Sequence, residues 1–153
     1  MSVDRLIARL ERIGDAYNPT SQEMKMALTR IGTVLQAEMR LNIGRHKMID
    51  QGRLLNSIKY EIEQSGDTAF LSVGSYGIRY AAINEFGGAM SRRQVKAMFV
   101  ALRERNGRVK RSGKGIVTIN PDGTGWWKER PFIRPAIVKH REFMLDMLRT
   151  LGK

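Results

Sequence analysis

One change of hydrophobic period, near residue 58, constrains the fold of this 153-residue chain more than any other feature. Before it, apolar residues recur at spacings of three and four, which is typical of one face of a long helix: Met24, Ala27, Leu28, Ile31, Val34, Leu35 and Leu41. After it, Ile58, Tyr60 and Ile62 alternate with charged residues, which indicates a half-buried strand. A helix stripe and a strand face bury their apolar surfaces in one common core, so the pattern predicts an α+β fold.

The strand within Gly52 to Gln64 is expected to continue into an antiparallel hairpin. Residues Ser65 to Asp67 are a turn signal, and the stretch from Ala69 to Val73 alternates again. A third strand is predicted over Ile116 to Ile119, because these residues are β-branched and the proline- and glycine-containing turn Asn120 to Gly123 follows them. We expect the three strands to form one antiparallel sheet.

Three longer helices are predicted. The first ends near Gly14 and has the stripe Val3, Leu6, Ile7, Leu10 and Ile13. The second begins at the capping-box pair Thr20 and Glu23 and stops near Gly44. The last begins at Pro135 and has the stripe Ile137, His140, Met144, Met147, Leu148 and Leu151. We expect the second and last helices to cover one face of the sheet.

Length and composition favour a single domain, 1–153, that buries a core without disulfides, since the chain has no cysteine. Charged residues interrupt the apolar N-terminal sequence, so we expect no signal peptide or membrane span, but a soluble protein of a reducing cytoplasm. The predicted architecture is a small antiparallel β-sheet packed by a long N-terminal helix and a C-terminal helix, with a basic insertion. Its parts are a helical N-terminal part (1–44), a hairpin and short helix (52–88), the basic insertion (89–115), and a strand, RPF motif and C-terminal helix (116–153).

The net charge of +12 is concentrated in the C-terminal part. Residues 1–64 carry 10 basic and 8 acidic side chains, residues 65–90 carry 1 and 2, and residues 91–153 carry 16 and 5. The densest stretch holds nine basic residues against one acid, Glu104: Arg92, Arg93, Lys96, Arg103, Arg105, Arg108, Lys110, Arg111 and Lys114. This concentration indicates either a solvated charged surface or contact with a polyanion, which is nucleic acid or an acidic protein surface.

The basic segment is expected to have two parts. Apolar residues at helical spacing predict a helix in its first half: Val95, Met98, Phe99 and Leu102. The stretch from Asn106 to Gly115 contains several glycines and predicts a loop. Because like charges repel, we expect the whole segment to be flexible in the isolated subunit and to become ordered against a negatively charged partner.

Candidate catalytic groups are sparse. His46 and His140 lie far apart and outside any metal-binding motif, and the chain has neither a phosphate-binding loop nor a nucleophile elbow. Asp50, Glu85 and Asp122 are scattered acids, a weak basis for the Mg²⁺ site of a nuclease. We therefore expect no enzymatic activity, no cofactor and no metal.

Aromatic residues near the basic segment suggest a second use for it. Phe99, Trp126 and Trp127 could stack on bases, although no recognised nucleic-acid-binding motif accompanies them. Adjacent tryptophans in an extended chain point in opposite directions, so one is expected in the core and the other at an interface.

Two compact motifs, YAAINEFGG (Tyr80 to Gly88) and RPFIRPA (Arg130 to Ala136), are the candidate structural and interface elements. The first predicts a short core-docking helix ended by its glycine pair, with a catalytic loop as the alternative. In the second we expect Phe132 to be a buried anchor and both arginines to donate hydrogen bonds to carboxylates such as Glu85. The candidate residues are Tyr80, Asn84, Glu85, Phe86, Gly87, Arg130, Pro131, Phe132 and Arg134.

In series, GRLLNSI (Gly52 to Ile58), YAAINEFGG and RPFIRPA before a last helix resemble the tail-completion, or virion-morphogenesis, proteins of tailed bacteriophages and prophages. The resemblance covers Gly52 to the C-terminus. It implies a non-enzymatic structural virion protein of the neck and head-tail-joining group, acting in a homo-oligomeric ring at the head-proximal end of the tail. Implied partners are other neck and tail proteins, with DNA contact in the lumen and no membrane. The implied location is the virion, after assembly in the host cytoplasm.

The chain departs from the pattern of that family at two places. Asn84 stands where the family form Y-A-x-x-H-E-F-G has a histidine, and the insertion is long and basic. Both departures bear on ring contacts rather than on chemistry. The alternative function is a nucleic-acid-binding protein that uses residues 92–114, and a small nuclease is a more distant third.

Overall fold

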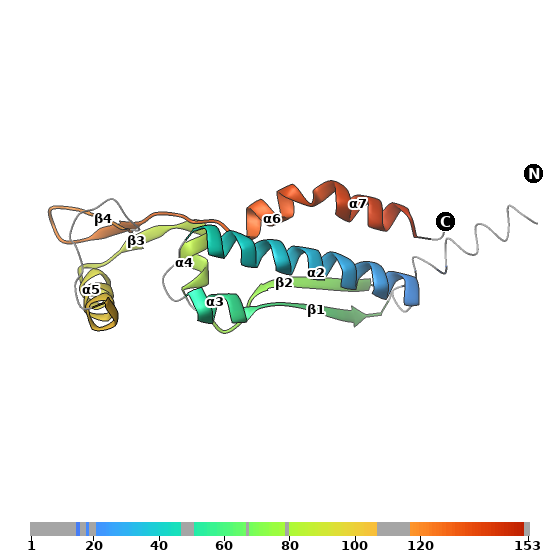
Figure 1. Ribbon diagram of the computed structural model, residues 1–153, viewed down its shortest axis with the longest axis horizontal. Coiled ribbons are helices and arrows are strands. Elements are labelled where there is room, and N and C mark those ends of the chain that lie inside the picture. Colours follow the sequence, from blue (N-terminus) through green and yellow to red (C-terminus); the bar gives the residue numbers. More distant parts are fainter. Residues whose placement is uncertain are drawn as a thin grey trace, which may run out of the picture. The chain divides into compact units, whose positions relative to one another are not determined.

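The computed structural model describes residues 15, 18, 21–46, 51–66, 68–78, 80–106 and 117–151, and the predicted helix at residues 3–13 lies outside them. The chain divides into two compact units: unit 1 is Met1–Ile78 with Phe132–Lys153, and unit 2 is Arg79–Pro131. The described elements, labelled in Figure 1 except for β5, are α2 (Gln22–Arg45), α3 (Gln51–Ser57), β1 (Ile58–Ser65), β2 (Thr68–Ser75), α4 (Ala81–Phe86), β3 (Gly88–Met90), α5 (Arg92–Asn106), β4 (Val117–Ile119), β5 (Gly125–Trp127), α6 (Ile133–Lys139) and α7 (Arg141–Arg149). The predicted α+β class is confirmed.

Helix α2 is the central element of unit 1. Its N-cap is Ser21, whose Oγ accepts a hydrogen bond from the Met24 amide at 3.1 Å. The sequence assigned this role to Thr20, which lies outside the described residues. The helix runs one residue past Gly44, the predicted stop, because a glycine inside a helix costs only about 1 kcal/mol relative to alanine.

The buried stripe of α2 lies further toward the C-terminus and is more polar than predicted. Its buried residues are Ala27, Leu28, Ile31, Gly32, Leu35, Glu38, Met39, Asn42 and Ile43. The prediction for Leu41 is wrong, because this side chain is 55% exposed. Polar residues complete the stripe instead, since Glu38 and Asn42 lie one helical turn apart on the same face as Leu35.

Helix α2 lies between the β1–β2 hairpin and the two C-terminal helices (Figure 1). It contacts β1 and β2 on one side and α6 and α7 on the other. The prediction that both helices cover one face of the sheet is therefore wrong, because α6 and α7 pack on α2. The predicted last helix is also divided at His140, between α6 and α7, and Ile137 of its predicted stripe is 43% exposed.

The predicted hairpin is confirmed. Strands β1 and β2 pair antiparallel, with Tyr60 opposite Val73 and Ile62 opposite Leu71. These four side chains are partly buried, whereas Glu61, Glu63, Phe70 and Ser72, which alternate with them, are exposed. Hydrogen bonds from α2 hold the start of β1, because Gln36 Nε2 and Arg40 Nη2 donate to the Ile58 carbonyl at 2.7 and 3.1 Å.

Gly32 sets how closely α2 approaches the hairpin. A Cβ at this position would lie 2.7 Å from two ring carbons of Tyr60 and 3.2 Å from Leu71 Cδ1. Gly32→Ala is therefore expected to lower the free energy of unfolding by about 1–3 kcal/mol, because the helix must move away from the strands. Urea unfolding followed by circular dichroism measures this loss.

Gly44→Ala is the matched control in the same helix, since a Cβ there would meet no atom within 4 Å. It is expected to be neutral or to stabilise α2 by up to about 1 kcal/mol. Equal stability changes for the two variants would contradict the close approach at Gly32.

Unit 2 contains a separate three-stranded antiparallel sheet in the order β3-β5-β4. The prediction that the third strand joins the hairpin is therefore wrong. Strand β4 pairs instead with β5 across the predicted turn, in which the Asn120 amide donates to the Thr124 carbonyl at 2.9 Å and Gly123 has φ 81°. The local turn provides a partner strand that the sequence analysis did not identify.

Helix α5 forms the first half of the basic segment, and this prediction is confirmed. A reciprocal capping box starts it: the Ser91 amide donates to Gln94 Oε1 at 2.8 Å, and the Gln94 amide donates to Ser91 Oγ at 3.3 Å. The expected flexibility of the basic segment stays a prediction, and residues 107–116 lie outside the described part. None of the described helices combines the length and hydropathy needed to cross a membrane.

Candidate functional site

The motif YAAINEFGG forms the predicted short helix, α4, and its buried residue Asn84 fastens the end of the β5 strand to it. The Asn84 side chain is 2% exposed, and its Oδ1 accepts a hydrogen bond from Trp127 Nε1 at 3.1 Å. The Asn84 carbonyl accepts a second hydrogen bond, from the Arg130 amide at 2.6 Å. The acceptor role does not require an asparagine, because a neutral histidine also offers one ring nitrogen as an acceptor.

Gly87 ends α4 in a conformation that other residues rarely adopt, with φ 66° and ψ −173°. A Cβ at this position would lie 2.8 Å from the Trp127 carbonyl oxygen and 3.1 Å from the Glu129 nitrogen. The backbone after β5 therefore passes directly beside this glycine. Together Asn84 and Gly87 hold the segment that leads to the second motif.

Other residues of the first motif differ in exposure. The Glu85 side chain is 1% exposed, whereas Phe86 is 66% exposed. Every buried side-chain nitrogen or oxygen within the described residues has a hydrogen-bond partner, so Glu85 lies in a satisfied polar environment. The pairing of Arg130 and Arg134 with this carboxylate stays a prediction.

The second motif places Phe132 in the core of unit 1. Its side chain is fully buried, and its carbonyl accepts a hydrogen bond from Asn42 Nδ2 of α2 at 3.2 Å. This burial agrees with the expected anchor, and Pro131 before it is partly buried. Burial also lowers the pKa of the Arg130 guanidinium below its ordinary value. Arg134 is exposed on α6.

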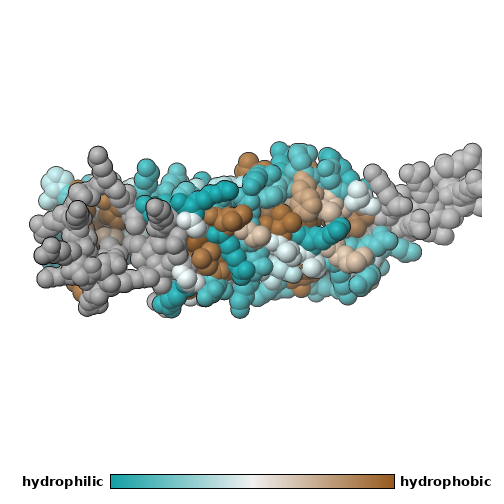
Figure 2. Space-filling view, in the orientation of Figure 1, coloured by the Kyte–Doolittle hydropathy of each residue, from teal (hydrophilic) through white to brown (hydrophobic). Residues whose placement is uncertain are grey.

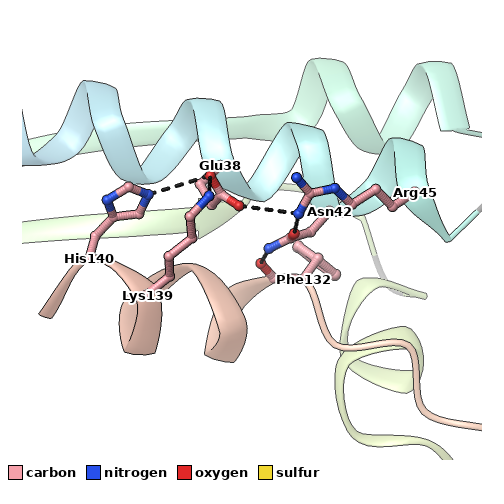
Figure 3. A network of polar contacts seen from close by, with 6 residues as sticks. All are labelled: Glu38, Asn42, Arg45, Phe132, Lys139 and His140. Carbon is pink, nitrogen blue, oxygen red and sulfur yellow. Dashed lines mark hydrogen bonds and ion pairs between the residues drawn. The ribbon is translucent and has the colours of Figure 1, made fainter.

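A polar network beside Phe132 is the feature that the sequence analysis missed (Figure 3). The Glu38 carboxylate, with 6% of its side chain exposed, pairs with Lys139 Nζ at 2.8 Å and with His140 Nε2 at 3.4 Å. Arg45 Nη1 lies 3.4 Å from Glu38 Oε1 and donates to Asn42 Oδ1 at 3.2 Å. The available signal was the pair Glu38 and Asn42, four residues apart within an otherwise apolar stripe. The network joins α2 to α6.

The hydrogen bond from Lys139 is the largest influence on Glu38 and holds the pKa of its carboxyl below 4.5, against the opposing effect of burial. Because the folded-state pKa is lowered, the folded protein binds fewer protons than the unfolded chain near that pH. The stabilisation is therefore fully present at pH values well above the ordinary pKa of a glutamate carboxyl, and it is lost as the pH falls through the folded-state pKa.

Glu38→Gln should remove this pH-dependent contribution. The wild-type protein is expected to exceed the variant in unfolding free energy above pH 4.5, with a difference that shrinks at lower pH. Urea unfolding at a series of pH values measures it. Lys139→Met, which removes the main partner, should shift the acid limb of the wild-type curve to higher pH. A constant difference at every pH would contradict the network's ionic character.

The described basic side chains of the insertion lie on α5. Arg92, Arg93 and Lys96 are exposed, and the stem of Arg92 lies beside Gly123 in the β4–β5 turn. The backbones of Arg103 and Arg105 belong to α5, while the sites of Arg108, Lys110, Arg111 and Lys114 lie outside the described residues.

The remaining candidates of the sequence analysis are dispersed. His140 belongs to the Glu38 network, His46 caps α2, and Asp50 lies outside the described residues. Hydrogen bonds from Thr124 lower the pKa of Asp122. In the described ranges, no group of three or more histidines and acids could hold a metal ion.

The two tryptophans divide as expected for an extended strand. Trp127 is 8% exposed, whereas its neighbour Trp126 is 54% exposed. In the register of the sheet, Trp126 lies opposite Ala89 on β3 and Thr118 on β4, both exposed. This sheet face therefore carries an accessible aromatic side chain.

Comparison with known protein families finds a match for the first half of the chain. Residues 4–87, more than half of the chain, match the family model described as "Bacteriophage HK97-gp10, putative tail-component". The matched residues include α2, α3, the β1–β2 hairpin and α4. No curated protein and no solved structure is similar enough to count as a match.

Proposed function

The chain belongs to the HK97-gp10-like family of bacteriophage tail components, and from that premise we propose that it is a tail-completion subunit, acting at the head-tail junction in a ring of identical copies. As a structural tail component it belongs to the virion and contacts other virion proteins. Under the proposal these partners are neck and tail proteins, and assembly takes place in the host cytoplasm.

The family match is the observation that carries the proposal. The geometry of the motifs supports it, because Asn84 and Gly87 hold backbone in place and Phe132 is buried. Residues used in this way stabilise the fold of each unit and take no part in chemistry. The order of the motifs from Gly52 to Ala136 adds the resemblance to tail-completion proteins.

The second candidate function is nucleic-acid binding through the basic segment. The exposed Arg92, Arg93 and Lys96 on α5 favour it, because phosphate contacts need accessible charge and little fixed geometry. A labelled DNA duplex should then be retarded at low salt, with a steep loss of affinity as salt rises.

Deletion of the gene from the source phage tests the proposed function. We expect filled heads and separate tails that fail to join, with infectivity restored by the intact protein supplied from a plasmid. Joined, infectious particles formed without this protein would overturn the proposal.

A further inference from the structure

The outer face of the β1–β2 hairpin is an exposed, acidic sheet surface. Helix α2 packs on the opposite face, and the outer face carries Glu61, Glu63 and Phe70, with Lys59 at its end near α3. Phe70 lies opposite Glu63 in the register and is 52% exposed. The two carboxylates contribute, after burial, to a raised pKa of the nearby Tyr76. The described residues form no ion pair with either carboxylate. We call this surface the hairpin outer face.

The exposed side of α5 has complementary properties. Spacings of three and four residues place Arg93, Lys96 and Val100 on one face of the helix, away from the buried Val95. Val100 is 55% exposed. Unit 2 as a whole carries twelve basic and four acidic residues, so this helix lies in a strongly positive field. We call this surface the α5 outer face.

We infer that the hairpin outer face of one copy of the chain docks on the α5 outer face of a second copy. Each surface combines a pair of like charges with one half-exposed apolar residue, and the two pairs, Glu61 with Glu63 and Arg93 with Lys96, are opposite in sign; Lys59 lies at the end of the hairpin outer face, next to Glu61 in the alternation. Helix-on-sheet packing would give the hairpin a helix on both faces, α2 of its own chain and α5 of the neighbour. The inference rests on the proposed function and names the contact between copies.

Such a contact is heterologous, because two different surfaces of the same chain meet. Repeated contacts of this kind close into a ring when the rotation permits. On the face of the molecule seen in Figure 2, hydrophobic patches over unit 1 are small and are separated by hydrophilic surface. Charge complementarity between two docked surfaces fixes their register and the choice of partner.

The acidic hairpin favours a second copy over DNA as the partner of α5. Glu61 and Glu63 cannot bind phosphate, because like charges repel, so DNA binding would use only the α5 outer face, whereas a neighbouring copy uses both surfaces. Binding of DNA by the α5 outer face is therefore the alternative result that the following experiment can detect.

The experiment uses charge reversal in the full chain, with self-association measured by sedimentation velocity over a concentration series. E61K/E63K and R93E/K96E should each weaken association by at least about tenfold, since repulsion replaces attraction at two positions. The quadruple variant that carries all four changes should regain association, because the signs are complementary again. Association of the wild-type protein should weaken as salt rises.

E142K/D146K is the matched control, because it changes the net charge by the same amount on exposed positions of α7. It should associate like the wild-type protein, and circular dichroism should show that every variant remains folded. If R93E/K96E abolishes duplex retardation while E61K/E63K leaves association unchanged, DNA is the partner of α5 and the inference is wrong. If none of the charge reversals changes self-association, the inferred contact is wrong, but the proposed ring of identical copies still stands. If the wild-type protein stays monomeric and is missing from virions, the proposed function itself is wrong.

Discussion

Phe132→Ala is expected to lower the free energy of unfolding of unit 1 by about 3–5 kcal/mol. The Phe132 side chain is fully buried. Its replacement by alanine loses the free energy gained by transferring the ring from water to the core, and it creates a cavity where the ring was. The Phe132 carbonyl also accepts the hydrogen bond from Asn42, so movement of the backbone into the cavity would disturb the helix contact as well. Urea unfolding followed by far-ultraviolet circular dichroism measures the change, because unit 1 contains α2, α6 and α7.

Val138→Ala is the matched control on α6, since this side chain is 75% exposed. It should change the free energy of unfolding by no more than about 0.5 kcal/mol. A melting profile of Phe132→Ala that matches those of the control and the wild-type protein would exclude the anchor role.

Gly87→Ala is expected to have a comparably large effect in unit 2, about 3 kcal/mol or more. Positive φ with extended ψ costs a non-glycine residue about 1–3 kcal/mol. The added Cβ also meets the backbone of Trp127 and Glu129, which cannot rotate away as a flexible side chain would. Both tryptophans of the chain lie in unit 2, so tryptophan fluorescence during urea unfolding reports this unit alone.

Gly88→Ala tests the explanation at the adjacent position. A Cβ there would make ordinary contacts, 3.7 Å from Ile83 Cγ1, and the residue has no positive φ. Its unfolding transition should stay close to that of the wild-type protein. Equal losses at the two glycines would show that the motif resists any added side chain, and that the conformation of Gly87 is not the cause.

Local patterns in the sequence predicted most helices and strands of the fold. The predictions that failed concerned which of these elements contact one another across long stretches of sequence. The alternation of Tyr60, Ile62 and Leu71 predicted the hairpin, because a strand with one buried face repeats every two residues. The partner of β4 depends on a three-residue strand, β5, whose pattern is too short to identify. The burial of Glu38 and Asn42 in the α2 stripe likewise depends on the packing of α6 and α7 against α2, which the local sequence does not indicate.

Within the candidate site, the motif boundaries were predictable and the roles of single residues were not. YAAINEFGG predicted a short helix and its glycine stop, since both are local properties. The bond from Trp127 to Asn84 joins residues 43 positions apart, and no periodicity in the sequence indicates it. Glu38 was missed for the same reason, because its partners Lys139 and His140 follow about a hundred residues later.

A cryo-electron microscopy reconstruction of the source phage tests the central claim most directly. We expect density for this chain in a closed ring at the head-proximal end of the tail, with the hairpin outer face of each copy against the α5 outer face of the next. Density for the chain along the tail tube or at the distal tip, or a particle without this chain, would contradict it.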